Sequence, residues 1–343
     1  MKFPRTLLSS ALLEGLLDTY PLCELNGIGT PESYDQDNVV LVFNPSQLKF
    51  LTSQPVLLIL DKKIDHQETP FSFITVSNAR FLLKQLLERT EHLFFADHDA
   101  IAHIHSTAIV HPSVVLGLNV TVGPYSIIDQ DTIIGDCVCI GANVHIQKNC
   151  VLANGVEIDS HTVLYPKSFI GEKTKIYASS VIGMQGFGFE LVNGEWQCLS
   201  HLSGVYIGKN CFIGSHVSIA AGTLYPTRIG DNVIIDNHVQ IAHHVEIGQG
   251  TAIAGCVGIA GSTKIGKYCL IGGGSGIAGH LTISDKVVIT GMTMVIKSLT
   301  EPGTYSSGMP AEENYTWRKK IAYLSRLPHL IKDFYQTQKR KND

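Results

Sequence analysis

A branched aliphatic residue returns at every sixth position over most of this chain. The series runs from Ile104 to Ile182, resumes from Ile207 to Ile219, and holds again from Ile229 to Val295. The residue after each repeated position is usually small or acidic. A helix has a period of about 3.6 residues and a half-buried strand a period of about 2, so neither produces this pattern.

A coil of three short strands does produce it, because each strand points one aliphatic side chain inward. Gly, Asn, Asp and Ser then fill the corners, where the backbone turns sharply. The three stretches hold 29 repeated positions, enough for about ten coils at three positions per coil. The sequence therefore predicts a β-solenoid with one long aliphatic core. A β-sandwich of short strands is the alternative, but it would not keep one residue class in phase for so long.

Two interruptions break the series, and the first of them is a candidate functional loop; at the second the series only slips by four residues. The first, Gly183–Ser203, contains Gly186–Phe189 and Trp196, and the second lies at Ala221–Arg228. A long loop inserted between the repeats of a repeat protein more often binds a ligand or forms an interface than has no function.

Residues 1–100 contain no six-residue repeat and predict a small α/β domain. Short apolar runs rich in branched residues predict strands, and leucine periodicity predicts helices. The expected strands are Val39–Phe43, Pro55–Leu60 and Phe73–Val76, and the expected helices are Leu7–Leu17 and Asn78–Arg89.

The solenoid is expected to occupy residues 101–300, followed by a helical extension over 301–343. Tyr315–Leu327 reads as a basic helix that Pro328 ends, and a second helix follows to the tail Lys339–Lys341. The positive charge of this segment favours an acidic partner, with a solvated helix face as the alternative.

Composition narrows the class of protein. Charged residues make up 16% of the chain and the formal net charge is −4, which argues against binding to nucleic acid phosphates. No apolar run reaches the 18 residues or more that an integral membrane segment needs. The eight cysteines form no C-x-x-C pair, as is typical of reduced cysteines in a cytoplasmic protein.

Histidines form the densest group of candidate catalytic residues. Asp236-Asn237-His238 is followed by His243-His244, and His280 lies two coils later. Imidazole accepts a proton readily near neutral pH, but a surface histidine is usually inert. The residues alone leave both interpretations of His243 and His244 open.

A set of ordered motifs gives the chain a close resemblance to a known family. It is similar over essentially its whole length to the UDP-3-O-acylglucosamine N-acyltransferases of the hexapeptide acyltransferase superfamily. The motifs are Ile234-Ile235-Asp236-Asn237, Gln240-Ile241-Ala242-His243, Ala260-Gly261-Ser262, Gly279-His280, Thr290-Gly291-Met292, Met294, Thr300-Glu301-Pro302-Gly303 and Tyr305-Ser306-Ser307-Gly308.

The resemblance implies a left-handed parallel β-helix, a hand that neither period nor composition reveals. It also implies a cytoplasmic homotrimer of lipid A biosynthesis with active sites between subunits. The family moves a 3-hydroxyacyl chain from acyl carrier protein to the 2-amino group of UDP-3-O-acylglucosamine. The chain would then need no metal and no cofactor of its own, because the donor is carried on the 4′-phosphopantetheine of acyl carrier protein.

The same resemblance assigns roles to residues. His243 is the general base, and Asp236 would orient its ring or favour its protonated form. The backbone N–H of Gly261 would stabilise the oxyanion. His280 is expected near the pantetheine or the substrate phosphates, and Asn237 would line the same cleft. Whether His243 faces Gly261 and His280 of a neighbouring coil or of a neighbouring chain stays open.

Met292 and Met294 match the region that bounds the acyl groove in the family. A wall at one depth of an apolar groove selects chain length, because each buried methylene contributes about 0.8 kcal/mol. Ordinary core filling is the alternative for both methionines.

The uridine site of the family corresponds to the stretch around Phe43, Asn44 and Pro45. Asn44 and Pro45 are retained, while Leu41 and Gln47 replace two aromatic residues; Phe43 or Phe50 would have to supply a ring. Further departures from the family pattern are Tyr165-Pro166-Lys167, Gln185, Ser200-His201 and Ala220-Ala221. The catalytic half is thus better retained than the half that binds the sugar nucleotide.

Three other functions are compatible with the sequence. The acceptor could be a different amino-sugar nucleotide, as expected of a diverged paralogue. A zinc hydratase on the same scaffold would need three converging histidines, for which His238, His243 and His244 are candidates. A catalytically inactive trimeric scaffold is the third.

Overall fold

The computed structural model describes residues 27–65, 69–95 and 103–342. Contacts within the chain divide it into two compact units, residues 1–99 and 100–343. The helix expected at Leu7–Leu17 lies outside the described residues. No helix in the described parts of the chain is both long and apolar enough to cross a membrane.

The first unit is a parallel four-stranded sheet with the order β1-β2-β3-β4. Its elements are β1 (Gly27–Gly29), β2 (Asn38–Val42), the 3-10 helix η2 (Pro45–Phe50), β3 (Leu57–Asp61), β4 (Ile74–Val76) and α1 (Ala79–Phe95). Leu82 and Leu86 of α1 pack against Leu41 and Ile59 on one face of the sheet. The predicted strands and the second predicted helix are confirmed to within a few residues, except that α1 extends further, to Phe95.

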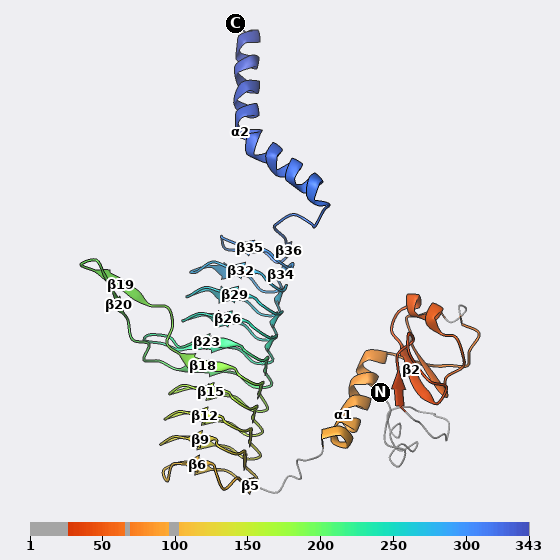
Figure 1. The fold of residues 1–343 in the computed structure, drawn as a ribbon, viewed down its shortest axis with the longest axis vertical. Coiled ribbons are helices and arrows are strands. Elements are labelled where there is room, and N and C mark those ends of the chain that lie inside the picture. The colour runs from red at the N-terminus through yellow and green to blue at the C-terminus, as the bar shows by residue number, and fades with distance from the viewer. Residues whose placement is uncertain (1–26, 66–68, 96–102, 343) are drawn as a thin grey trace. The chain divides into compact units, whose positions relative to one another are not determined.

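The second unit contains three long parallel sheets, each built from one strand per coil (Figure 1). The first sheet has eleven strands: β5 (His103–Ile104), β8 (Thr121–Val122), β11 (Cys139–Ile140), β14 (Glu157–Ile158), β17 (Lys175–Ile176), β22 (Phe212–Ile213), β25 (Ile234–Ile235), β28 (Ala252–Ile253), β31 (Leu270–Ile271), β34 (Val288–Ile289) and β36 (Thr304–Tyr305). The second sheet has ten: β6 (Ile109–Val110), β9 (Ile127–Ile128), β12 (His145–Ile146), β15 (Val163–Leu164), β18 (Val181–Met184), β23 (Ser218–Ala220), β26 (Gln240–Ile241), β29 (Gly258–Ile259), β32 (Gly276–Ile277) and β35 (Met294–Val295). The third sheet has nine: β7 (Val115–Leu116), β10 (Ile133–Ile134), β13 (Val151–Leu152), β16 (Phe169–Ile170), β21 (Val205–Ile207), β24 (Thr227–Ile229), β27 (Glu246–Ile247), β30 (Lys264–Ile265) and β33 (Thr282–Ile283).

The repeated aliphatic residues form the core of this solenoid. From Val122 to Val295 almost all of them are buried, with exposed fractions of 5% or less. Strands of successive coils pair residue for residue, as with Ile235 and Ile253 in the first sheet. Ile104, in the first coil, is 43% exposed because no earlier coil covers it. The predicted fold class, a parallel β-helix of about ten coils with an α/β unit before it and a helix after it, is confirmed.

From Asn119 onward, most corners hold a residue in the left-handed region of backbone conformation, often Asn or His. Several candidate functional residues occupy this corner position, including His244 (φ 57°), His280 (φ 60°) and Met292 (φ 57°). Their side chains therefore project from the turns, outside the aliphatic core.

Both interruptions of the repeat leave the solenoid at the same edge. The first connects β18 of the second sheet to β21 of the third and contains the antiparallel hairpin of β19 (Phe189–Val192) and β20 (Glu195–Cys198). Figure 1 shows this hairpin projecting from the side of the solenoid. The second connects β23 to β24 in the next coil.

The C-terminal segment is a single helix, α2 (Asn314–Asn342), with Pro328 inside it. The prediction that Pro328 ends a first helix is therefore wrong. Proline removes one backbone donor and crowds the preceding turn, which kinks a helix without having to end it. Figure 1 shows α2 bent near its middle.

Candidate active site

One edge of the solenoid, between the second and third sheets, gathers the candidate catalytic residues. His243, Gly261 and His280 lie in the turns that follow β26, β29 and β32. Ser262 N–H donates to the His243 carbonyl at 2.9 Å, and His280 N–H donates to the Gly261 carbonyl at 3.0 Å. Within one chain, these residues therefore come from neighbouring coils. We call this edge the histidine edge.

The imidazole of His243 lies directly against the α-carbon of Gly261. A Cβ atom at position 261 would stand 2.6 Å from Cε1 and 2.8 Å from Nε2 of His243. Only glycine leaves room for the ring in this position. Among the described residues, the Gly261 N–H has no hydrogen-bond acceptor. A backbone donor is thus available beside an imidazole, as the assigned oxyanion role requires.

His244 connects His243 to the second interruption. Its Nδ1 lies 2.9 Å from Nδ1 of His243, and its Nε2 accepts a hydrogen bond from the Thr223 backbone N–H at 2.8 Å. The His244 backbone N–H donates to Oγ1 of Thr227 at 2.9 Å. The irregular turn between β23 and β24 therefore holds His244 in place. The sequence marked this turn only as a slip in the repeat.

The first interruption folds back over His243. The ring centroid of His201 lies 5.3 Å from that of His243. Oε1 of Gln185 accepts the His201 backbone N–H at 3.1 Å, and Nε2 of Gln185 lies 2.7 Å from Nδ1 of His201. A Cβ atom on Gly186 would stand 2.7 Å from Nε2 of His201. Sequence reasoning recorded Gln185 and His201 only as departures from the family, and the structure brings both to the histidine edge.

Burial and neighbouring histidines lower the pKa of His243 below its usual value of 6.5. Burial has the largest effect, and repulsion by His201 and by His280 acts in the same direction. A hydrogen bond with the Phe187 backbone opposes them by favouring the charged ring. Burial, His243 and His201 likewise lower the pKa of His244. Both imidazoles are therefore neutral near pH 7, the form in which an imidazole can accept a proton.

Asp236 and its neighbours lie at the opposite edge of the second sheet. Oδ1 of Asp236 accepts the Asn237 backbone N–H at 2.8 Å, and Oδ1 of Asn237 accepts the Ser215 N–H at 2.7 Å. The ring of His238 stacks on His216 at 5.0 Å. Within one chain the structure thus does not bring Asp236 or Asn237 to His243, because strand β26 and its flanking turns separate them. His238 does not converge with His243 and His244, and no metal-binding group of three is found among the described residues.

The outer face of the second sheet joins these two edges and carries two glycines. Gly258 and Gly276 occupy outward positions on β29 and β32, and a Cβ atom on either would meet nothing within 4 Å. Met294 pairs with Gly276 on the next strand and is 69% exposed, and Met292 is 77% exposed. Core filling is therefore wrong for both methionines. Their place in an acyl groove stays a prediction.

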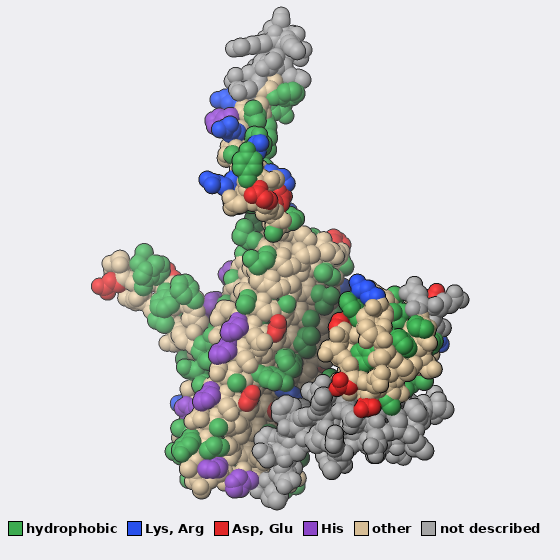
Figure 2. Space-filling model, turned by 45° about the vertical axis from the view of Figure 1, so that its right-hand side comes forward, with side chains coloured by type: hydrophobic (Ala, Val, Ile, Leu, Met, Phe, Trp, Pro, Cys, Tyr) green, Lys and Arg blue, Asp and Glu red, His purple; other side chains and the backbone are tan. Residues whose placement is uncertain are grey.

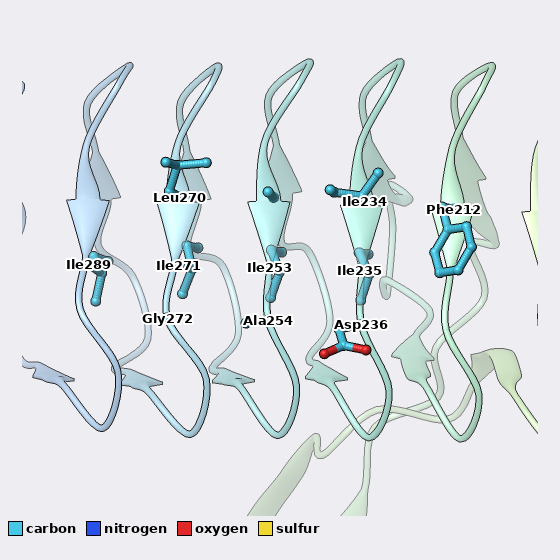
Figure 3. Close-up of a pocket in the computed structure, with 11 residues that line it drawn as sticks. Phe212, Ile234, Ile235, Asp236, Ile253, Ala254, Leu270, Ile271, Gly272 and Ile289 are labelled. Carbon is cyan, nitrogen blue, oxygen red and sulfur yellow. The ribbon is translucent and has the colours of Figure 1, made fainter. Parts of the chain in front are cut away.

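A hollow of about 480 Å³ lies on the first sheet (Figure 3). Phe212, Ile234 and Leu270 form its walls and are 40–51% exposed, while Ala252 and Gly272 leave space between them. Asp236 is the charged residue of the lining. The hollow is an apolar surface next to the edge that carries Asp236.

In the first unit, the candidate nucleotide-binding stretch follows β2. Oε1 of Gln47 accepts the backbone N–H of Phe43 at 2.9 Å, so this side chain holds the turn that contains Asn44 and Pro45. Leu41 is 2% exposed and belongs to the core of the unit. The two positions that depart from the family are thus accounted for by packing and turn geometry. Phe43 is half-buried, with the Arg80 guanidinium 5.6 Å from its ring centroid.

Comparisons with known proteins show which chains this one is similar to. Residues 226–261 match the family described as bacterial transferase hexapeptide (six repeats), and residues 204–241 match the hexapeptide repeat of succinyl-transferase. The chain is 36% identical to a UDP-3-O-acylglucosamine N-acyltransferase of Pseudomonas paraeruginosa, over 92% of this chain and 88% of the relative. It is 33% identical to the protein of that name from Coxiella burnetii, over 92% of both. A solved UDP-N-acetylglucosamine acyltransferase from Campylobacter jejuni aligns with a TM-score of 0.46 and 23% identity, covering 57% of this chain and 68% of that chain.

Proposed function

The chain belongs to the family of the UDP-3-O-acylglucosamine N-acyltransferases, and we propose that it performs this reaction in lipid A biosynthesis. It would transfer a 3-hydroxyacyl group from acyl carrier protein to the 2-amino group of UDP-3-O-acylglucosamine. The observation that carries the proposal is the neutral imidazole of His243, seated on Gly261 beside a free backbone donor.

In the proposed mechanism, His243 acts as the general base. The amine attacks the thioester carbonyl and His243 takes a proton from the amine nitrogen. The Gly261 N–H donates to the oxygen that becomes negative in the tetrahedral intermediate. When the intermediate collapses, the carbon–sulfur bond breaks and the imidazolium returns its proton to the pantetheine sulfur. The amide and a free thiol result, and His243 is neutral again.

The acyl chain is proposed to lie on the outer face of the second sheet. Gly258 and Gly276 provide an open floor there, and Met294 follows directly on the next strand. Each methylene that an apolar groove buries contributes about 0.8 kcal/mol. A methionine at the end of such a floor would therefore favour acyl chains of one length. His280 is proposed to contact the pantetheine or a substrate phosphate.

The proposed oligomer is a homotrimer. The apolar hollow on the first sheet, with Phe212, Ile234 and Leu270, is a suitable subunit contact. Asp236 lies at the edge of the second sheet away from His243 of its own chain. Assembly would allow Asp236 of one subunit to orient His243 of another, and Asn237 to line the same cleft.

Acyl carrier protein is proposed to dock on α2. Arg318, Lys319 and Lys320 lie together near its start and are exposed, and Trp317 is 43% exposed beside them. Figure 2 shows Lys and Arg side chains interspersed with hydrophobic ones along this helix. Basic and aromatic groups together suit an acidic protein surface. A location in the cytoplasm, where acyl carrier protein would be available, is part of the proposal.

A different amino-sugar nucleotide is the second candidate acceptor. The family has aromatic residues at positions 41 and 47. Here Leu41 is buried in the core and Gln47 holds a turn, so neither offers an aromatic ring to uracil, and this favours another acceptor. Phe43 and Phe50 remain as candidate rings, and Phe50 is 42% exposed.

The test is an acyl-transfer assay with 3-hydroxyacyl donors on acyl carrier protein. UDP-3-O-acylglucosamine and other amino-sugar nucleotides would be compared as acceptors. His243→Ala is expected to lower kcat/KM by a factor of about 10²–10⁴, the usual worth of general acid–base catalysis. A loss of less than tenfold would contradict the proposed mechanism. Faster transfer to another acceptor would identify the second candidate function.

A further inference from the structure

The hydrogen bonds around His244 specify which of its nitrogens carries the proton. The Thr223 backbone N–H can only donate, so Nε2 of His244, 2.8 Å away, must offer its lone pair. A neutral imidazole then carries its proton on Nδ1. That Nδ1 lies 2.9 Å from Nδ1 of His243, so His244 donates to His243. The tautomers are thus assigned from the hydrogen-bond network.

The tautomer of His244 determines the tautomer of His243, the proposed base. If Nδ1 of neutral His243 accepts a hydrogen bond from His244, then Nε2 of His243 carries the proton. In this arrangement His243 has no free lone pair with which to take a proton from an amine. The resting tautomer is the wrong one for a general base.

Thr223 also provides what the opposite tautomer needs. Its hydroxyl Oγ1 lies 3.0 Å from the same Nε2 of His244, and a hydroxyl can accept as well as donate. With a proton on Nε2, His244 would donate to this hydroxyl and accept from Nδ1–H of His243. Nε2 of His243 would then be a free acceptor. Each ring keeps one proton, so the change moves protons without adding or removing any.

We propose that Thr223 and His244 form a tautomer switch for His243. The backbone N–H of Thr223 stabilises the resting tautomer, and the Thr223 hydroxyl stabilises the tautomer that accepts the amine proton. Thr223 and His244 are positioning residues, because they act through His243. The switch rests on the proposed role of His243 as the base.

The surroundings of His244 favour movement of protons over rotation of the ring. His244 is 8% exposed, and the ring centroid of Tyr225 lies 4.3 Å from its own. A Cβ atom on Gly222 would stand 2.9 Å from Cδ2 of His244. The ring is held on several sides and has little room to turn over. The direction of the hydrogen bonds that link Thr223, His244 and His243 therefore reverses by proton transfer, without rotation of the His244 ring.

The experiment compares Thr223→Val with Thr223→Ser in the full-length protein. Valine has nearly the shape of threonine and keeps the backbone N–H, but it lacks the hydroxyl. We expect Thr223→Val to lower kcat by about five- to tenfold, the worth of one hydrogen bond, with little change in KM. Thr223→Ser should stay within about twofold of the unaltered protein, because the hydroxyl is retained.

A structural readout separates the switch from a general loss of packing. The ¹⁵N resonances of His243 distinguish a protonated from an unprotonated Nε2. We expect Thr223→Val to increase the population with Nε2 protonated, while thermal unfolding stays unchanged. Equal kcat values and equal ¹⁵N signals for Thr223→Val and Thr223→Ser would overturn the switch. If His243→Ala itself keeps its activity, the proposed base is wrong, and the two failures are thus distinguishable.

Discussion

Among single residues of the site, Gly261 is constrained directly by the proposed base. Its backbone dihedrals are not in the left-handed region, so an alanine could adopt them without strain. The restriction comes only from the imidazole of His243, which lies where a Cβ atom would project. A substitution at position 261 should therefore affect catalysis, through the His243 ring, without affecting folding.

Gly261→Ala is expected to displace the His243 ring and to lower kcat/KM by at least about tenfold, within the range of general acid–base catalysis. The free energy of unfolding should change by less than about 1 kcal/mol, because no backbone strain is introduced. Gly303→Ala is the matched control, since its Cβ atom would make only an ordinary contact, 3.6 Å from Cε2 of Tyr305, and the residue has no part in the proposed site. Steady-state kinetics and thermal unfolding of both variants measure the difference. Equal activity of the two variants would refute the steric argument.

The pH dependence of the reaction follows from the lowered pKa of His243. A general base works in its neutral form, so activity is lost as pH falls through that pKa, which lies below 6.5. His201 repels the charged form of His243, while His244 and His280 also face it. His201→Asn removes one repulsion, raises the pKa of His243, and should move the acid limb of kcat/KM to higher pH. An acid limb that stays in place or moves to lower pH would contradict this assignment.

Among the elements, the strands were predictable and the turns at the histidine edge were not. One aliphatic residue in six fixes the strands, because every coil must bury the same kind of side chain. The contact of His201 with His243 and that of Thr223 with His244 depend on the paths of two irregular loops. No periodicity encodes such a path. Pro328 is a similar case, because whether proline ends or only kinks a helix depends on the turns around it.

The strands β29 and β32 offer a test of the proposed acyl floor. Gly276→Leu would place a side chain in open space on the outer face, beside Met294. We expect unchanged thermal stability, with kcat/KM reduced more for long acyl donors than for short ones. Assays with a series of hydroxyacyl donors measure this selectivity. An equal reduction for every chain length would place the acyl chain elsewhere.

For the solenoid as a whole, stability comes from neighbouring coils covering one another. Ile182 lies in the middle of the stack and is 0% exposed, while Ile104 in the first coil is 43% exposed. Ile182→Ala should lower the free energy of unfolding by about 2–5 kcal/mol. Ile104→Ala should cost about 1 kcal/mol or less, since much of its side chain already contacts water. Denaturant unfolding of both variants measures the two losses of free energy. Equal losses would contradict the view that neighbouring coils bury the core of each coil.

The two interruptions of the repeat extend from one edge of the solenoid, in adjacent coils. After each of them the strands pair again in the same parallel sheets. Ile170 pairs with Ile207 across the first, and Ile219 pairs with Ile241 across the second. The pairing of strands in the solenoid thus does not depend on the length of the loop inserted between them. Loops of other lengths could be grafted at this edge to reshape substrate choice while the scaffold stays as it is.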